Sequence, residues 1–566
     1  MSSTKANIVT AGLRPELFAD PFARHLSRKA VISLLVLLAL AGFGLRAWGL
    51  SAEGLSEDEL NKLNAVADYR AHGLTAINSE HPLLMKAFQT GSVVAAEKWN
   101  GLGFVAARPA ALGVRVEAAL RLPSIIFGAL TAILIYLVAA ELFGVEVGLI
   151  AAALWAVEPQ AAGFNRIAKE DTFLLFFFLL ANVFWLRGQR VAEGDTGKDP
   201  RPYYWATGAA YGAMLASKYV PHYIAISACY NYVFQGIKAT RWRIGRPRYA
   251  IFLAVMGAVF LLCNPTILLP GTWRQMLAFA GQKRIGHDGN EFMGALYPHH
   301  FTAWLKGVPW YFYFVFIGVK LPPATVLAFV VGLPQLFRRR LGDGRYFLLF
   351  WAIYWLPWVV LGGKFTRYFT FALPLVLIAA AVGMQSVARL LVRGDSESPA
   401  LAQRRLYLHT GLASLLLGAS LWASLDAAPH YRLYTNLFGG GAARAGHYFP
   451  HDEFYDSRQR ESLAEIARRA RAGAKVASET PGLADYYARQ AGRDDLVSVS
   501  LSDPSALKEL AVGDFVIVAR GRRYFSNDAR VTALRQTNAP AFSLALGETP
   551  AVDVYVWRQS DAVEVR

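Results

Sequence analysis

Long apolar segments separated by short polar loops dominate the first three quarters of the chain. A helix needs about 20 mostly apolar residues to cross a lipid bilayer. By this measure the pattern predicts eleven membrane spans, at residues 31–50, 122–143, 146–164, 172–188, 203–217, 219–237, 249–270, 309–337, 346–362, 367–391 and 406–425. We therefore predict a polytopic α-helical membrane protein.

The same pattern divides the chain into three parts. Residues 1–29 are polar and basic and should form a cytoplasmic tail, whereas residues 30–425 hold the predicted spans and a long first outer loop at 51–118. Residues 426–566 alternate short apolar runs with amphipathic stretches, which predicts a small, largely parallel α/β domain. Its expected strands are 474–478, 497–501 and 514–519, and its expected helices are 462–472, 483–490 and 505–510.

The distribution of charge orients these spans. Basic residues gather in loops on alternate sides of the spans, at 187–201, 238–248, 338–345 and 389–405. Cytoplasmic loops are enriched in lysine and arginine, so the N-terminus should be cytoplasmic and the C-terminal domain periplasmic or extracellular. A bacterial inner membrane is the expected location. The net charge of +17 thus reflects topology, and we expect no nucleic-acid partner. Cys229 and Cys263 both fall in apolar segments and imply no disulfide framework.

Three consecutive acids, Glu57, Asp58 and Glu59, begin the polar part of the first outer loop. Consecutive helical residues do not share a face, so one or two of them can face a cavity while the others cap the following helix. A carboxylate in a cavity can accept a proton from a hydroxyl. A divalent metal at this cluster is not excluded, although we expect no cofactor.

A second polar cluster, Glu80, His81 and Lys86, follows in the same loop. Proline after His81 favours an extended entry, and Lys86 then falls on the first turn of a helix. The simpler interpretation of Lys86 is a lysine that snorkels to the membrane interface. Arg121, at the start of the second span, could likewise anchor to lipid headgroups.

Further cations are predicted at the outer face, where the positive-inside rule makes them unexpected. Together with Lys86, they are Arg166, in a charged run that ends at Asp171, and Lys218, Lys364 and Arg367. Arg166 can pair with Glu170 four residues later. An anionic headgroup held at this level would explain the whole set, since lysine and arginine are the usual phosphate partners.

Other types of site find little support. The loop at 271–308 contains His287, Asp288, Glu291, His299 and His300, but their spacing fits no metal pattern and favours an ordinary polar loop. We find no glycine-rich phosphate loop or nucleophile elbow. Nucleotide binding is therefore disfavoured, which argues for a lipid-linked donor over a nucleotide sugar.

Several short motifs occur in an order that resembles one family. They are the Asp-Glu pair after the first span, His81-Pro82 with Lys86, Arg121-Leu122-Pro123-Ser124, Leu215-Ala216-Ser217-Lys218, Pro309-Trp310-Tyr311-Phe312-Tyr313, and Arg367-Tyr368 with Pro374. Over roughly residues 45–375 the chain resembles the bacterial form of the dolichyl-phosphate-mannose protein mannosyltransferases. More distantly it resembles the lipid A aminoarabinose transferase. Both are C-type (GT-C) membrane glycosyltransferases, and residues 426–566 lie outside the resemblance.

This resemblance implies roles for individual residues. Asp58 would be the catalytic carboxylate with Glu59 beside it, and His81 and Lys86 would line the site. Arg166, Lys218 and Arg367 would be candidates for the donor phosphate, and Arg121, Asp171, Lys364 and Tyr368 complete the expected substrate-binding set. The family's usual His-Pro-Pro-Leu-Gly-Lys is altered here at residues 81–86, and the loop at 271–308 is too short for the β-trefoil of eukaryotic members.

We therefore expect an inverting glycosyltransferase that works on the outer side of the membrane. It would move a sugar from a polyprenyl-phosphate donor to an acceptor hydroxyl of a protein, lipid or glycan, with the lipid bilayer as its other partner. The alternative is a transporter or flippase of lipid-linked sugars, which should show inverted repeats and broken helices. We find no such pair of segments. A non-catalytic sensor is a third class, but it would not need this gathering of acids, histidine and lysine.

Overall fold

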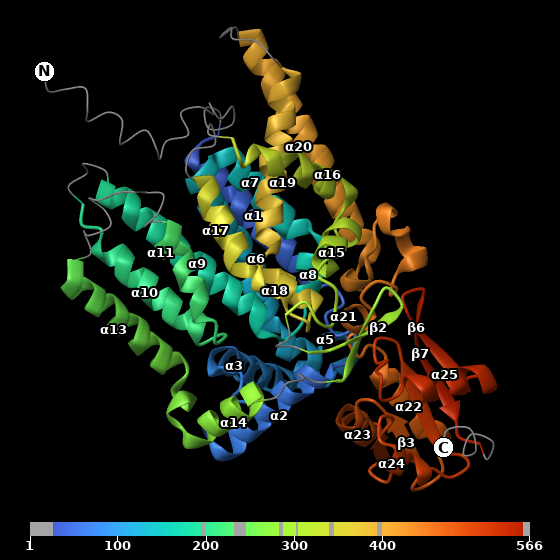
Figure 1. Ribbon diagram of the computed structural model, residues 1–566. Coiled ribbons are helices and arrows are strands. Elements are labelled where there is room, and N and C mark those ends of the chain that lie inside the picture. The colour runs from blue at the N-terminus through green and yellow to red at the C-terminus, as the bar shows by residue number, and fades with distance from the viewer. Residues whose placement is uncertain are drawn as a thin grey trace, which may run out of the picture.

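A computed structural model describes residues 26–193, 198–230, 245–281, 287–300, 304–338, 344–392 and 399–558. The tail through residue 25 and the end of the span predicted at 219–237 lie outside these ranges. Figure 1 shows a bundle of long helices with a small domain of strands and short helices at one end.

Five helices in the described residues are long and apolar enough to cross a membrane. These spans are built on α1 (Arg28–Ala47), α6 (Val116–Phe143), α9 (Glu170–Glu193), α19 (Leu373–Leu391) and α20 (Pro399–Ala427). The pair α7 (Val145–Val157) and α8 (Pro159–Asn165), bent by 61°, makes a sixth if it is one span. The molecule is thus a multi-pass helical membrane protein, but the predicted count of eleven spans is not confirmed.

Proline explains part of the difference between the two counts. The apolar stretch predicted as one span at 309–337 is divided into α15 (Phe312–Lys320) and α16 (Pro323–Gln335) by Pro322-Pro323. A proline has no amide hydrogen to continue a helix and restricts the residue before it, so helices usually end there. Other predicted spans are shorter helices: α10 (Arg201–Leu215), α11 (Ile224–Cys229), α13 (Gly245–Cys263), α17 (Gly344–Trp355) and α18 (Pro357–Val360).

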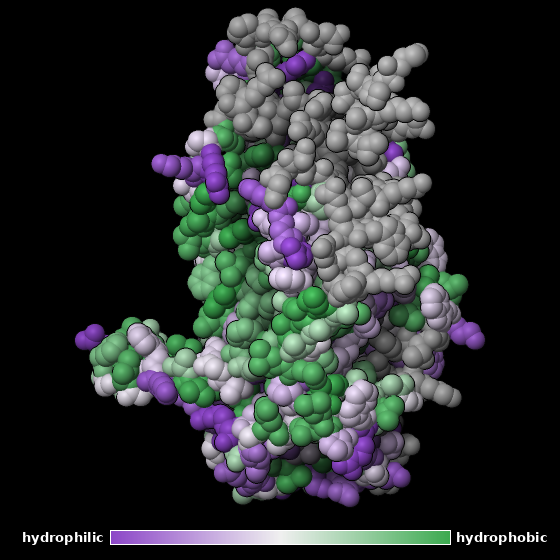
Figure 2. Space-filling model, turned by 90° about the vertical axis from the view of Figure 1, so that its left-hand side faces the viewer, coloured by the Kyte–Doolittle hydropathy of each residue, from purple (hydrophilic) through white to green (hydrophobic). Residues whose placement is uncertain are grey.

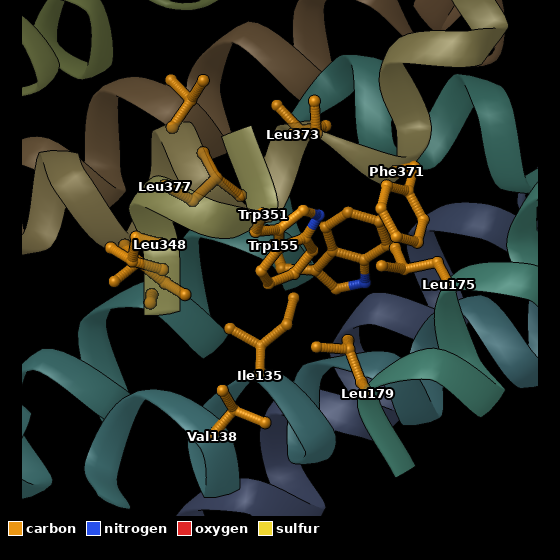
Figure 3. Close-up of a cluster of buried hydrophobic side chains, with 14 of the residues drawn as sticks. Ile135, Val138, Trp155, Leu175, Leu179, Leu348, Trp351, Phe371, Leu373 and Leu377 are labelled. Carbon is orange, nitrogen blue, oxygen red and sulfur yellow. The ribbon is translucent and has the colours of Figure 1, made fainter. Parts of the chain in front are cut away.

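An aromatic and aliphatic core holds the bundle together. Figure 3 shows side chains of α6, α7, α9, α17 and α19 meeting around Trp155 and Trp351, with Phe371 beside them. Both tryptophans are fully buried. Many apolar side chains also remain on the outside of the helices, and Figure 2 shows hydrophobic surface over much of the middle of one face, with hydrophilic groups below it. Such a surface suits a lipid environment.

The first outer loop folds into helices that lie across one end of the bundle. They are α2 (Glu57–His72), α3 (Leu83–Asn100), α4 (Gly103–Ala106) and α5 (Pro109–Leu112), with α14 (Pro270–Gly281) beside them. Ser56 and Glu59 form a capping box that starts α2, in which each side chain accepts a hydrogen bond from the other residue's amide. The hairpin of β1 (Gly289–Phe292) and β2 (Ala295–Pro298) belongs to the same end.

The C-terminal region carries a five-stranded sheet in the order β4-β3-β5-β7-β6. Its elements are α21 (Pro450–Phe454), α22 (Gln459–Arg469), β3 (Lys475–Ser478), α23 (Pro481–Gln490), β4 (Val497–Ser500), α24 (Pro504–Lys508), β5 (Phe515–Ala519), α25 (Asp528–Thr537), β6 (Phe542–Leu546) and β7 (Thr549–Val556). The three predicted strands are present and parallel. The sheet is nevertheless mixed, because a tight turn at Gly547, with φ of 60°, joins β6 and β7 into an antiparallel hairpin beside β5.

This sheet region shares a hydrophobic core with the first outer loop. Leu55 and Val66 from the loop and Ala119 from α6 lie in one cluster with Leu463 and Tyr487 of the C-terminal region. The Tyr487 hydroxyl also accepts a hydrogen bond of 2.5 Å from the Leu55 amide. The two regions are therefore packed as one unit at this end of the molecule.

Candidate active site

Asp58 lies in the first turn of α2, where the loop, the bundle and the C-terminal region meet. Its Oδ2 atom is 2.9 Å from the Lys169 Nζ and 3.7 Å from an Arg367 guanidinium nitrogen. The Tyr455 hydroxyl donates a hydrogen bond of 2.7 Å to the same oxygen. The Asp58 side chain is still 37% exposed, so the carboxylate is both anchored and accessible.

These contacts decide the protonation state of Asp58. Burial alone would raise the pKa of its carboxyl, but the charges of Lys169 and Arg367 and the hydrogen bond from Tyr455 hold that pKa well below its usual range. A carboxylate surrounded by cations and donors keeps its charge at neutral pH. Asp58 is therefore an anion in the ligand-free protein.

A hollow of about 580 Å³, partly open to solvent, lies next to this carboxylate. Its lining brings together segments far apart in sequence: Ser56, Glu57, Asp58, His287, Gly289, Asn290, His299, Phe365, Arg367, His451, Tyr455, Asp456, Arg522 and Tyr524. We call it the Asp58 cavity. Its walls come from α2, the β1 hairpin, the segment before α19 and the C-terminal region, so the last of these helps to build the site.

The C-terminal wall of this cavity is a hydrogen-bonded network around Arg522. Its guanidinium forms a two-pronged ion pair with Asp456 and donates to His287 Nε2 at 2.9 Å. Arg522 can only donate, so His287 Nε2 must be unprotonated. Burial and Arg522 lower the pKa of His287 to about 2. Asp456 also accepts from the Glu57 amide at 2.9 Å, which fastens the start of α2 to this wall.

Glu59 points away from the cavity and is 1% exposed. Its two carboxylate oxygens accept hydrogen bonds from the Arg121 guanidinium at 2.8 and 2.7 Å, and one of them also accepts from the Ala168 amide at 3.0 Å. Arg121 also donates to the backbone carbonyls of the loop before α2. This geometry favours a positioning role for the pair: together they fix α2, and with it Asp58, against α6.

His81 and Lys86 belong to a second buried cluster centred on Glu170. The Glu170 carboxylate is 2.9 Å from the Lys62 Nζ and 3.4 Å from the His81 Nδ1. The Lys86 ammonium donates to the Asn78 and His81 carbonyls at 2.7 and 3.0 Å. Since Glu170 directly follows Lys169, the partner of Asp58, the cluster adjoins the site from the side of the bundle.

The remaining predicted residues lie at varying distances from this centre. The Lys218 ammonium is 2.5 Å from the Asp171 carboxylate and sits over the Tyr368 ring, next to Arg367. In contrast, Arg166 donates to the carbonyls of Arg46, Trp48 and Gly49, and Lys364 to those of Val308 and Leu361. Both are bound to backbone rather than to the cavity, and their binding of donor phosphate stays a prediction.

Sequence reasoning missed the residues that complete the surroundings of Asp58. Lys169 stood in the charged run at 165–171 but was not singled out from it. The other missed residues are Tyr455, Asp456 and Arg522, which lie roughly 400 to 460 residues from Asp58 and belong to no motif. A structural signal marks two of them: Tyr455 and Asp456 have positive φ angles, a strained conformation that concentrates at functional sites.

No group of three or more His, Cys, Asp or Glu side chains in the described ranges is arranged to hold a metal ion. His287 and His299 both line the Asp58 cavity. Glu57 lines the same cavity, and its Oε2 atom is 3.9 Å from the His287 Nε2 and 3.4 Å from an Arg522 guanidinium nitrogen. Burial raises the pKa of the Glu57 carboxyl.

Comparisons with known proteins agree with this architecture. Residues 102–268 match the family Dolichyl-phosphate-mannose-protein mannosyltransferase. An Archaeoglobus fulgidus oligosaccharyltransferase, AglB, solved with an inhibitory peptide and a dolichol-phosphate, superimposes with a TM-score of 0.51 at 12% identity, over 88% of this chain and 70% of AglB. ArnT from Cupriavidus metallidurans, bound to undecaprenyl phosphate, gives 0.49 at 12% identity, over 93% and 98% of the two chains. No curated protein matches this chain.

The fold defines a class: a multi-pass membrane protein folded like the oligosaccharyltransferase AglB. Within that class, the resemblance to the dolichyl-phosphate-mannose protein mannosyltransferases is confirmed over residues 102–268.

Proposed function

We propose that this chain transfers a sugar from a polyprenyl-phosphate donor to an acceptor hydroxyl, with Asp58 as the group that accepts the acceptor's proton. The observation that carries the proposal is an exposed, ionised carboxylate flanked by Lys169 and Arg367 at the wall of a cavity. The family match supports the reaction class. Placement of the cavity on the outer side of the membrane rests on the charge of the loops.

A large apolar groove supports a lipid-linked donor. It has about 1070 Å³ of open space and is lined by side chains of α15, α16, α17 and α19, including Phe329, Leu348 and Trp355. Phe369 lines the same groove and lies two residues after Arg367 in a short helix, η5 (Thr366–Phe371). A polyprenyl chain in the groove would therefore bring its phosphate towards Arg367.

The cations beside Asp58 fit a phosphate leaving group. Lys169 and Arg367 can neutralise the charge that develops on the phosphate oxygen as the bond to the sugar breaks. When Lys169 and Arg367 contact the donor phosphate, their positive charges lower the pKa of Asp58 less. Its basicity then rises when the acceptor is to be deprotonated, whereas in the ligand-free state it is held as a weak base.

The reaction is a single displacement. The acceptor oxygen attacks the anomeric carbon, its proton passes to Asp58, and the carbon–oxygen bond to phosphate breaks, which releases polyprenyl phosphate with the bonding electron pair. The anomeric carbon is inverted. Lys169, Arg367 and Tyr455 all converge on Oδ2 of Asp58, so we assign Oδ1 to the acceptor hydroxyl.

The test is Asp58→Asn in the purified full-length protein. Transfer of radiolabelled sugar from a lipid-linked donor to a membrane extract should fall by about 10²–10⁴-fold, as expected for loss of a general base. Asp68→Asn is the matched control, because Asp68 lies on the same helix and pairs only locally, with His72 and Thr75. It should transfer at the wild-type rate. An Asp58→Asn protein that retains activity would exclude the assigned role.

A further inference from the structure

A second hollow lies against the Asp58 cavity, inside the C-terminal region. It has about 590 Å³ of open space and is lined by Glu291, Glu479, Leu501, Ile517, Val518, Ala519, Arg520, Gly521, Arg522, Arg523, Val531 and Arg535. We call it the arginine hollow. Arg522 lines both hollows. Strand β1 also separates them, because Asn290 lines the Asp58 cavity and the next residue, Glu291, lines the arginine hollow.

The arginine hollow occupies a defined place in the sheet. Strands β3, β4 and β5 are parallel, and β3 lies between the other two. The side chains of α22 and α23 pack in one core, and those of α24 and α25 in another, so the connections that leave β3 and β5 run on opposite faces. Open α/β sheets bind ligands in the crevice at the carboxyl ends of two such strands. Glu479 and Arg520, which follow β3 and β5, line the hollow there.

The lining is unusually rich in arginine. Four guanidinium groups, from Arg520, Arg522, Arg523 and Arg535, face two carboxyl groups, from Glu291 and Glu479. Burial raises the pKa of both carboxyls. Glu479 already accepts hydrogen bonds from Asn527 and Ser502, so its oxygens are largely occupied by neutral donors.

The four arginines differ in how strongly other residues of the protein bind their guanidinium groups. Arg522 is fixed by Asp456, and Arg523 by Asp528. Arg520 makes longer hydrogen bonds, of 3.2 and 3.4 Å, to backbone carbonyls. Arg535, on α25, is 42% exposed, and its carboxylate neighbour Asp553 is 3.8 Å away. A bound anion could therefore engage Arg535 and Arg520 without breaking the network that shapes the Asp58 cavity.

We propose that the arginine hollow is the acceptor subsite, and that it selects an acceptor carrying a phosphate or carboxylate group near the hydroxyl that receives the sugar. Guanidinium groups bind both anions through paired hydrogen bonds. Because Arg522 and β1 line both hollows, such an anion would lie next to the cavity that holds Asp58. This inference rests on the proposed function and specifies its acceptor.

Anion binding is tested first, with radiolabelled inorganic phosphate as the probe. Equilibrium dialysis would use the full-length protein saturated with undecaprenyl phosphate, so that the donor's own phosphate position is filled. Wild type and Arg468→Gln should bind the probe saturably, because Arg468 is an exposed arginine on α22 away from the hollow. Arg535→Gln should bind it about tenfold more weakly. Absent binding in wild type, or equal binding by Arg535→Gln, would overturn the subsite.

Transfer to a membrane extract tests the link to the acceptor. Arg535→Gln should raise the KM for the extract acceptor about tenfold while the thermal unfolding midpoint stays that of wild type, and Arg468→Gln should transfer normally. The labelled product should carry a phosphate or carboxylate group. Partition of this product between organic solvent and water then distinguishes a lipid acceptor from a soluble glycan. Wild-type transfer kinetics retained in Arg535→Gln, or a labelled product without an anionic group, would refute the acceptor role. The proposed function fails separately, if wild type neither transfers the sugar nor hydrolyses the donor.

Discussion

At the scale of single residues, the state of Asp58 depends on the side chains around one of its oxygens. Two cations and one hydroxyl converge on Oδ2. Tyr455 is the least expected of the three, because it comes from the C-terminal region and sits in the left-handed backbone conformation, with φ of 46° and ψ of 53°. Its hydroxyl stabilises the ionised form of the carboxylate.

Removing that hydroxyl should shift the pH profile of transfer. The pKa of Asp58 is depressed in the folded protein, and loss of a donor to the carboxylate raises it. In Tyr455→Phe, activity should therefore begin to fall at a higher pH as the solution is acidified. Profiles of kcat/KM against pH would show the shift. Tyr486→Phe is the control, since Tyr486 bonds Gln490 on the same helix; an unmoved acid limb would contradict the role of Tyr455.

Lys86 makes a different prediction, about stability. Burial lowers the pKa of its ammonium to about 7, while an unfolded chain keeps a value near 10.4. Between these values the unfolded state binds more protons, so the free energy of unfolding rises with pH through this window and the cost of burying the charge is fully present below pH 7. Thermal unfolding in detergent from pH 7 to 10 should show this rise in wild type. Lys86→Met should flatten it; an unchanged slope would mean that Lys86 does not titrate in this range.

At the scale of elements, helix α2 is the part that must be held in place. Its first turn carries Asp58, its capping box uses Glu59, and Glu59 in turn pairs with Arg121 of α6. The three acids at the start of α2 therefore do three things: Glu57 faces the cavity, Asp58 binds the cations, and Glu59 anchors the helix. This division follows from the angular spacing of consecutive helical residues.

Substitution of Glu59 should show whether this residue holds α2 in place or takes part in the reaction. Glu59→Gln leaves the buried Arg121 without its charged partner, and breaking such a pair costs about 3–5 kcal/mol. The unfolding midpoint should fall clearly, and transfer should fall with it because α2 moves. Glu97→Gln breaks an exposed pair with Arg70 and should change stability by less than about 1 kcal/mol. A Glu59→Gln protein of normal stability but without activity would instead indicate a chemical role.

The sequence predicted the elements better than the contacts between them. Hydropathy is a local property, so the long helices and the three parallel strands of the C-terminal region could be read directly. The charged cluster at 57–59 and Arg367 were recognised through motif order, and the structure brings Asp58 and Arg367 together. Tyr455, Asp456 and Arg522 could not be found this way, because their place beside Asp58 depends on packing between distant segments.

At the scale of the whole molecule, the C-terminal region is part of the wall of the Asp58 cavity and part of the hydrophobic core. Leu55 and Val66 share a cluster with Leu463 and Ile466. Glu53, just before α2, is also tied to this region through His430, Arg432 and Ser457. The first outer loop thus has its folding partners at the far end of the chain.

A chain that ends after residue 425 should therefore be both inactive and less stable. It would expose the apolar side chains of α2 that now pack with α22 and α23, and leave Glu53 without His430, Arg432 and Ser457. We expect aggregation in detergent, a lower unfolding midpoint and no transfer, measured by size-exclusion chromatography, thermal unfolding and the sugar-transfer assay. If the shortened chain stayed monodisperse and transferred sugar, the C-terminal region would be an appendage rather than a wall of the site.

The shared core also constrains how the protein is made. Domains generally fold in the order in which the ribosome synthesises them, yet Asp58 meets Tyr455 only after some 400 further residues have been added, and its neighbour Glu57 meets Arg522 later still. A nascent chain therefore carries Asp58, the proposed base, long before the surrounding cavity exists. The Asp58 cavity is thus completed late in synthesis, so a stalled or clipped polypeptide would reach the membrane without the wall that Tyr455 and Arg522 supply.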